Sequence, residues 1–192
     1  MSFTYPVFLS LKNKRAVVIG GGKIATRKVT ALLKAEADVV VVTKEASRGL
    51  LRLAEKGKIR CHRRPFHPSD IQGAWLVIAA TNDRALNERI AREARKRRQW
   101  INVVDKPALC QLIFPSIVRK GKLTMAISTN GASPALAKAI RKDLQKNFIP
   151  KYEQLLKKIA RRRKTVLKSV TSIEKRREIL NRMARELLEE VR

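Results

Sequence analysis

The sequence has few cysteines, few aromatic residues and no long hydrophobic runs, and each shortage excludes a class of protein. Two cysteines in 192 residues are too few for a disulfide framework or a cysteine-rich zinc module. Aromatic residues make up 5% of the chain, which leaves little for the stacking platforms of nucleic-acid-binding proteins. The apolar runs are no longer than a β-strand, and the N-terminus shows no signal-peptide pattern. We therefore expect a cytoplasmic protein with no membrane association and no specific nucleic-acid partner.

Acidic residues are also scarce, with 16 Asp and Glu against 44 Lys and Arg. The formal net charge of +28 will attract polyanions such as nucleic acid, anionic lipid or a substrate with many carboxylates or phosphates. A solvated coat of lysine and arginine with no dedicated partner would give the same composition. The hydrophobic fraction of 44% is that of a globular protein, and the chain is long enough to bury a substantial core.

Strand-sized apolar runs alternate with helical patterns over the first half of the chain. The alternation predicts strands at residues 15–19, 38–42, 58–63, 75–80 and 100–104. Helices are predicted after the first strand, around residues 47–56 and at residues 85–96. Repeated strand–helix–strand units connect by right-handed crossovers and form a parallel sheet covered by helices on both faces. We therefore expect an α/β, Rossmann-like domain.

The pattern changes after residue 105. A hairpin is predicted from strands at residues 114–118 and 122–128, joined by the turn Arg-Lys-Gly-Lys. Ser133 and Pro134 then begin a helix that is expected to end before Pro150, and the rest of the chain is charged and helical. The sequence thus divides into a parallel-sheet domain over residues 1–113, a small α+β segment over 114–150 and a helical C-terminal region over 151–192.

The glycines after the first strand match a dinucleotide-binding fingerprint. Residues 20–25 read Gly-Gly-Gly-Lys-Ile-Ala, a version of the pattern G-x-G-x-x-A between a strand and a helix. Gly20 allows the tight turn, Gly22 lets the backbone approach a pyrophosphate, and Ala25 is small enough for the helix to pack on the strand. A glycine-rich turn without a ligand is the alternative. The strand before the motif and the helix after it favour a dinucleotide site.

Three later strand ends supply further candidate residues for this site. After the second strand, Thr43 or Glu45 could bind the ribose hydroxyls, whereas Lys44 could tolerate a 2′-phosphate, so NAD and NADP both remain open. After the strand at residues 75–80, Thr81 lies where adenosine or ribose would bind. The last parallel strand contains Asn102 and is followed by Asp105, which is either a ligand-binding carboxylate or a turn residue.

Several blocks together resemble the precorrin-2 dehydrogenase family. They are VVIGGGKIATRK, RRPFHPSDIQGAWLVIAATNDRALN, and NVVDKPALCQLIFPSIVRKGKLTMAISTNGASPALAKAIR, and the match runs in order from about Tyr5 to Arg141. This family includes the N-terminal module of bacterial siroheme synthases and a yeast dehydrogenase–ferrochelatase. The glycine motif alone would not carry the resemblance, whereas the NVVD and STNGASP blocks at matching distances do.

The resemblance implies a function and an assembly. It implies oxidation of precorrin-2 to sirohydrochlorin with NAD as hydride acceptor, and some relatives also insert Fe²⁺, so Fe²⁺ or Co²⁺ is a candidate second substrate. It implies that residues 1–113 bind NAD and that residues 114–150 build a homodimer. The expected partner is an anionic tetrapyrrole, and its carboxylates would explain part of the positive charge.

The resemblance also assigns residues. Asp105 would be the catalytic carboxylate, and also the metal ligand if the protein is a chelatase. Lys23 and Ile24 would contact NAD through their backbone. The loop before the helix that begins at Pro134 would hold substrate carboxylates, through Ser128, Thr129, Asn130, Gly131 and Ser133. The chain departs from the usual family pattern at Glu36, where glycine is common, and at Lys106, where an acidic or small residue is common.

Two other interpretations stay open at this stage. A non-catalytic NAD-sensing domain would show the same glycine-rich start but would not explain the later blocks. His62 and His67 invite a metal interpretation, yet neither has a second ligand at a standard spacing, which favours surface or turn histidines. Cys110 follows the NVVD block without a neighbouring histidine and is expected to be a buried packing residue.

Overall fold

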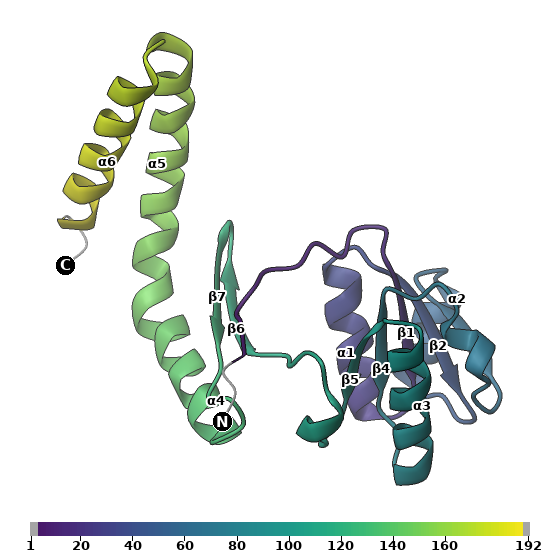
Figure 1. Cartoon of the computed structure of the whole chain (residues 1–192). Coiled ribbons are helices and arrows are strands. Elements are labelled where there is room, and N and C mark those ends of the chain that lie inside the picture. The colour runs from purple at the N-terminus through teal and green to yellow at the C-terminus, as the bar shows by residue number, and fades with distance from the viewer. Residues whose placement is uncertain (1–3, 190–192) are drawn as a thin grey trace. The chain divides into compact units, whose positions relative to one another are not determined.

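The computed structural model describes residues 4–189, and these form two compact units (Figure 1). The first unit is Tyr5–Ile113. The second begins at Phe114 and also contains Thr4 near the N-terminus. No helix among residues 4–189 is both long and apolar enough to cross a bilayer.

The first unit is built on a five-stranded parallel sheet in the order β3-β2-β1-β4-β5. Its strands are β1 (Arg15–Ile19), β2 (Asp38–Thr43), β3 (Arg60–Arg63), β4 (Leu76–Ala79) and β5 (Trp100–Val103). The predicted strands and their parallel arrangement are thus confirmed, with ends that differ by at most two residues. The strand order reverses between β1 and β4, and parallel sheets bind ligands at the carboxyl ends of strands at such a point.

Helices cover both faces of this sheet because the central strands are apolar on both sides. In β1, β2 and β4, alternate residues belong to two separate core clusters. One cluster packs against α1 (Lys23–Lys34) and α2 (Arg48–Glu55), and the other packs against α3 (Arg84–Lys96). The unbroken valines of β2 are all buried, as expected for an internal parallel strand.

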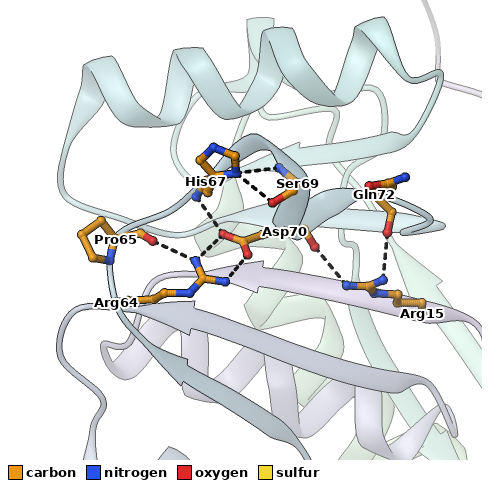
Figure 2. A network of polar contacts seen from close by, with 7 residues as sticks. All are labelled: Arg15, Arg64, Pro65, His67, Ser69, Asp70 and Gln72. Atoms are coloured by element: carbon orange, nitrogen blue, oxygen red, sulfur yellow. Dashed lines mark hydrogen bonds and ion pairs between the residues drawn. The ribbon is translucent and has the colours of Figure 1, made fainter.

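An ion pair between the half-exposed Arg64 and the buried Asp70 anchors the connection from β3 to β4 (Figure 2). The Arg64 guanidinium donates to both carboxylate oxygens of Asp70, in the short helix η1 (Pro68–Ile71), at 2.5 and 2.9 Å. Burial alone would raise the pKa of Asp70, but this pair and the His67 amide outweigh it and lower the pKa. Arg15 at the start of β1 donates to backbone carbonyls of Asp70 and Gln72 (Figure 2). The His67 ring accepts a hydrogen bond from the Ser69 amide and so caps η1, in line with the expectation of a turn histidine.

The second unit combines a hairpin with helices. Strands β6 (Ser116–Lys120) and β7 (Leu123–Ile127) pair in antiparallel register around Gly121, which confirms the predicted hairpin. Helix α4 (Pro134–Asp143) begins as predicted, because the Ser133 hydroxyl accepts a hydrogen bond from the Leu136 amide at 3.1 Å. Helices α5 (Ile149–Ser169) and α6 (Ile173–Glu189) pack against each other.

The predicted helix end before Pro150 is wrong. After α4 the chain continues through a π-helical turn, η3 (Leu144–Phe148), directly into α5. Pro150 lies in the first turn of α5, directly after this π turn, at a position where proline is tolerated. The π turn absorbs the change in hydrogen-bonding register, which a sequence pattern based on the ordinary helical period does not reveal.

Helix α1 ends in a left-handed residue that is not glycine. The amides of Glu36 and Ala37 donate to the carbonyls of Leu33 and Leu32 at 3.0 and 3.2 Å, the hydrogen-bond pattern of a Schellman motif. Glu36 itself has a φ of 59°, a region that an L-residue other than Asn or Asp occupies at a cost. The departure from glycine noted at this position therefore stores strain.

We expect Glu36→Gly to stabilise the protein by about 0.5–1 kcal/mol, because relief of left-handed strain outweighs the added entropy of the unfolded chain. The exposed Lys12–Glu36 ion pair that this change removes contributes little. Urea unfolding of the two proteins measures the difference. Glu36→Asn should give part of the same gain, and a loss of stability in both variants would contradict the assignment of strain.

Candidate dinucleotide-binding and catalytic site

The turn after β1 brings three backbone segments together without room for side chains. Gly20 has a φ of 125°, and a Cβ atom placed on it would lie 2.2 Å from the carbonyl oxygen of Ala80. A Cβ atom on Gly21 would lie 1.7 Å from the carbonyl oxygen of Glu45. Glycine is therefore required at both positions, for conformation at the first and for space at the second.

Gly22 is different, because a Cβ atom there would meet no protein atom within 4 Å. Gly22 is the N-cap of α1, and no side chain caps this helix or places a negative charge in its first turn. Lys23 and Ile24 are exposed beside it, whereas Ala25 is fully buried against the sheet. The first amides of α1 thus face open space, an arrangement that suits the pyrophosphate of a dinucleotide.

In the segment after β2, one residue holds the loop in shape and the next two are exposed. Thr43 is buried, and its hydroxyl donates to the Glu45 carbonyl at 2.8 Å. The Ser47 amide donates to the Gly21 carbonyl at 2.9 Å, which fastens this loop to the glycine turn. Thr43 therefore shapes the loop, and Lys44 and Glu45 are exposed beside it.

At the end of β4, hydrogen bonds of a buried side chain also hold the loop. The Thr81 hydroxyl is 2.7 Å from Asn87 Oδ1, and Asn87 Nδ2 donates to the Thr81 carbonyl at 2.9 Å. Asn87 is buried in α3 and was not identified from the sequence, because a single polar residue inside a helical pattern gives no signal of its contacts. Asn82 is exposed beside this pair.

Asp105 follows β5 at the same edge of the sheet. It is exposed and has a φ of 56°, a conformation that Asp and Asn adopt more readily than other non-glycine residues. Asn102 is buried, and its Nδ2 donates to the Leu112 carbonyl at 2.9 Å. Cys110 is half-buried, and its sulfur lies 3.2 Å from both the amide nitrogen and the carbonyl oxygen of Val103. The expectation of simple packing at Cys110 thus misses its hydrogen bonds.

Lys28 on α1 is a further ionisable group near this edge. Burial, and then the charge of Arg27, lower its pKa to about 8, while electrostatic interactions with Cys110 and Asp105 act in the opposite direction. The ammonium, the thiol and the carboxylate therefore influence one another. The sequence did not point to Lys28, because desolvation depends on the tertiary packing of α1.

The predicted substrate loop lies in the second unit and is ordered by its own hydroxyl groups. Ser128 Oγ and Thr129 Oγ1 accept hydrogen bonds from the amides of Asn130 and Ser133, both at 3.1 Å. Asn130 and Gly131 have φ values of 49° and 87°. The backbone amides of Asn130, Ala132 and Ser133 are therefore already used within the loop.

No metal-binding cluster of three or more His, Cys, Asp and Glu side chains occurs among residues 4–189. Asp105 is one of the exposed carboxylates that follow strands at this edge of the sheet. Its single carboxylate does not amount to a resident metal site.

The sheet order, the glycine turn and the uncapped helix together define a Rossmann-type dinucleotide-binding protein. Residues 7–116 match the family described as "Putative NAD(P)-binding", and residues 120–147 match "Sirohaem biosynthesis protein central". The chain therefore belongs to this NAD(P)-binding family, in the form that occurs in sirohaem biosynthesis proteins.

Relatives and a solved structure agree with this assignment. The siroheme synthase of Methylobacillus flagellatus is 39% identical over 174 residues, which cover 91% of this chain and 37% of that protein. That of Mannheimia succiniciproducens is 41% identical over 141 residues, covering 73% of this chain and 30% of that protein. The chain thus spans about a third of these curated relatives. The structure of SirC, a precorrin-2 dehydrogenase, matches with a TM-score of 0.82 and 29% identity over 98% of both chains.

We expect Gly22→Ala to weaken NAD binding by roughly tenfold or more, equivalent to about 1.4 kcal/mol, because its methyl group would occupy the pyrophosphate position. Its unfolding midpoint should change little, since no protein atom lies in the way. Gly21→Ala is the matched control and should be strongly destabilised by the Glu45 carbonyl. Calorimetric NAD titration and thermal unfolding test this pair, and unchanged NAD affinity in Gly22→Ala would contradict the placement.

The lowered pKa of Lys28 predicts a pH-dependent stability difference. The unfolded chain holds this proton up to its usual pKa of 10.5, whereas the folded protein releases it at about 8. Stability contributed by this group therefore rises as pH increases between these values, and the cost of burying the ammonium is fully present below pH 8. Relative to wild type, Lys28→Met should be most stable at pH 7 and lose that advantage by pH 10. Urea unfolding at both pH values measures this, and a constant difference would contradict it.

Proposed function

We propose that this chain oxidises precorrin-2 to sirohydrochlorin with NAD as hydride acceptor. The observation that carries the proposal is the position of Asp105 after β5, which pairs with β4, on the same carboxyl edge of the sheet as the glycine turn after β1. The likeness to a precorrin-2 dehydrogenase over nearly the whole chain supports the same reaction.

The reaction removes a hydride and a proton from a reduced tetrapyrrole. NAD, when bound, supplies the hydride acceptor. Asp105 is exposed at the sheet edge and is the residue that we assign to accept the proton. Lys28 sits close enough to influence this carboxylate electrostatically, and its positive form favours the ionised base.

The substrate class follows from charge. Precorrin-2 is a polycarboxylate, and a chain with net charge +28 attracts it over a long range at low ionic strength. We assign the loop from Ser128 to Ser133 to carboxylate binding through its hydroxyl groups and the Gly131 turn. We also assign residues 114–150 to a homodimer interface, and residues 1–113 to NAD binding.

Insertion of Fe²⁺ or Co²⁺ into the product stays a prediction. The exposed carboxylate of Asp105 could ligate an incoming metal ion, which is a substrate in that reaction. A non-catalytic NAD-sensing role is the alternative, and activity measurements separate it from both enzyme functions.

Asp105→Asn should reduce kcat for precorrin-2 oxidation by about 10²–10⁴-fold, the usual contribution of a general base. Asn tolerates the left-handed backbone and has nearly the same shape, so folding and NAD affinity should be unchanged. Anaerobic incubation with precorrin-2 and NAD, followed by absorbance, measures sirohydrochlorin formation.

Asp83→Asn is a matched control, because it removes an exposed carboxylate that caps α3 in the same unit. It should leave kcat near the wild-type value. Wild-type protein that binds NAD but leaves precorrin-2 unchanged would contradict the dehydrogenase proposal and favour NAD sensing. Addition of Fe²⁺ or Co²⁺ to the product in the same cuvette tests chelation separately.

A further inference from the structure

The chain between β5 and Leu112 forms a closed loop that presents Asp105. It leaves the sheet at Val103, and the Gln111 amide returns to donate to the Ile101 carbonyl at 2.9 Å. Inside the loop, η2 (Pro107–Leu109) is a single short helical turn with no buried residue. The loop is therefore held at its two ends rather than by a core of its own.

Two side chains close these ends. The Asn102 amide donates to the Leu112 carbonyl at 2.9 Å and lies 3.5 Å from the Cys110 sulfur. The Val103 amide donates to the same sulfur at 3.2 Å. The thiol proton has two acceptors in reach, the carbonyls of Val103 at 3.2 Å and of Lys106 at 3.3 Å. The sulfur thus joins both sides of Asp105.

Asp105 depends on this closure for its direction. Its backbone is in the left-handed region, which Asp and Asn adopt more readily than other non-glycine residues, and the contacts on either side of it select this conformation here. Within residues 4–189 the carboxylate itself takes no hydrogen bond from a protein group, so the backbone sets where it points. The Lys106 amide donates to the Val103 carbonyl at 3.4 Å across the turn that contains Asp105, and both of these bracketing residues also contact Cys110.

We propose that Asn102 and Cys110 form a clamp that positions Asp105 for catalysis, and that neither residue reacts with the substrate. This inference rests on the proposed function of Asp105. The clamp reassigns Asn102, which was expected to contact the cofactor, because its amide is buried and donates to the loop. It also gives Cys110 a function that needs no ionised thiol.

Apolar packing offers a competing explanation for the ordered loop. Leu109 and Cys110 pack against one core cluster and Leu112 against the other, so both loop ends also touch the hydrophobic core. If packing alone orders the loop, a side chain of similar size without hydrogen bonds would serve equally well at position 110. If the clamp orders it, hydrogen-bonding capacity matters more than size.

The test compares Cys110→Ser, Cys110→Val and Asn102→Leu with wild type. Serine keeps the donor and acceptor, whereas valine keeps the volume and loses both. Cys61→Val is the matched control, because Cys61 is also half-buried and lies in β3 at the far edge of the sheet. We measure kcat and KM for precorrin-2 and NAD, and amide hydrogen exchange of the peptide covering residues 103–112.

Cys110→Val and Asn102→Leu should lower kcat, approaching the roughly 100-fold loss that a displacement of about 1 Å produces, while KM for NAD stays within about twofold. Exchange should accelerate in residues 103–112 alone. Cys110→Ser should restore most of kcat and slow exchange again, and Cys61→Val should change neither measurement.

Faster loop exchange in Cys110→Val with unchanged kcat would overturn the positioning function. Unchanged exchange would overturn the clamp itself and favour packing. A wild-type protein without precorrin-2 turnover would count against the proposed function instead, and the exchange data would still show whether the clamp exists. Failure of one idea is therefore distinguishable from failure of the other.

Discussion

The structure of the first unit depends on one close approach of backbone to backbone at the carboxyl edge of the sheet. The glycine turn lies against the Ala80 and Glu45 carbonyls at distances that exclude any side chain. Because β1, β2 and β4 must end at the same level for this contact, the turn fixes where the neighbouring loops begin. It also aims the first amides of α1 at open space, so a packing constraint creates the anion site.

The loops around this turn share one arrangement. After β2, β4 and β5, a polar side chain that is buried or half-buried holds the loop by hydrogen bonds, and an exposed side chain lies next to it in the sequence. Thr43 holds the loop that exposes Lys44, and Asn87 holds Thr81 beside the exposed Asn82. Asn102 and Cys110 hold the loop that exposes Asp105. Buried polar groups need hydrogen-bond partners inside the protein. The hydrogen bonds that satisfy these groups are therefore the same ones that order the site.

This arrangement explains how far the sequence could predict the molecule. Hydrophobic periodicity located the strands and helices, and the glycine spacing located the dinucleotide turn, because both are local patterns. The direction of a polar side chain at a strand end is not local. Thr43, as an alternative to Glu45, and Asn102 were predicted to contact the cofactor, and a local sequence pattern does not reveal that both also donate to nearby carbonyls. The lowered pKa of Lys28 could not be predicted from the sequence, because it arises from burial. The continuous helix through Pro150 could not be predicted either, because a π turn breaks the usual helical period.

A thiol suits the position of Cys110 for a physical reason. The site is half-buried against the core cluster that contains Ile101 and Val103, so a strongly hydrated group there would lose much of its solvation. A thiol behaves as a small apolar group with a weak donor and acceptor, and it can pack against this cluster while satisfying the Val103 amide. The left-handed Asp105 follows the end of β5 by two residues, so its exposed carboxylate lies close in sequence to the ordered sheet. A loop without a core of its own can therefore hold a reactive group in place, because its hydrogen bonds to β5 keep it ordered.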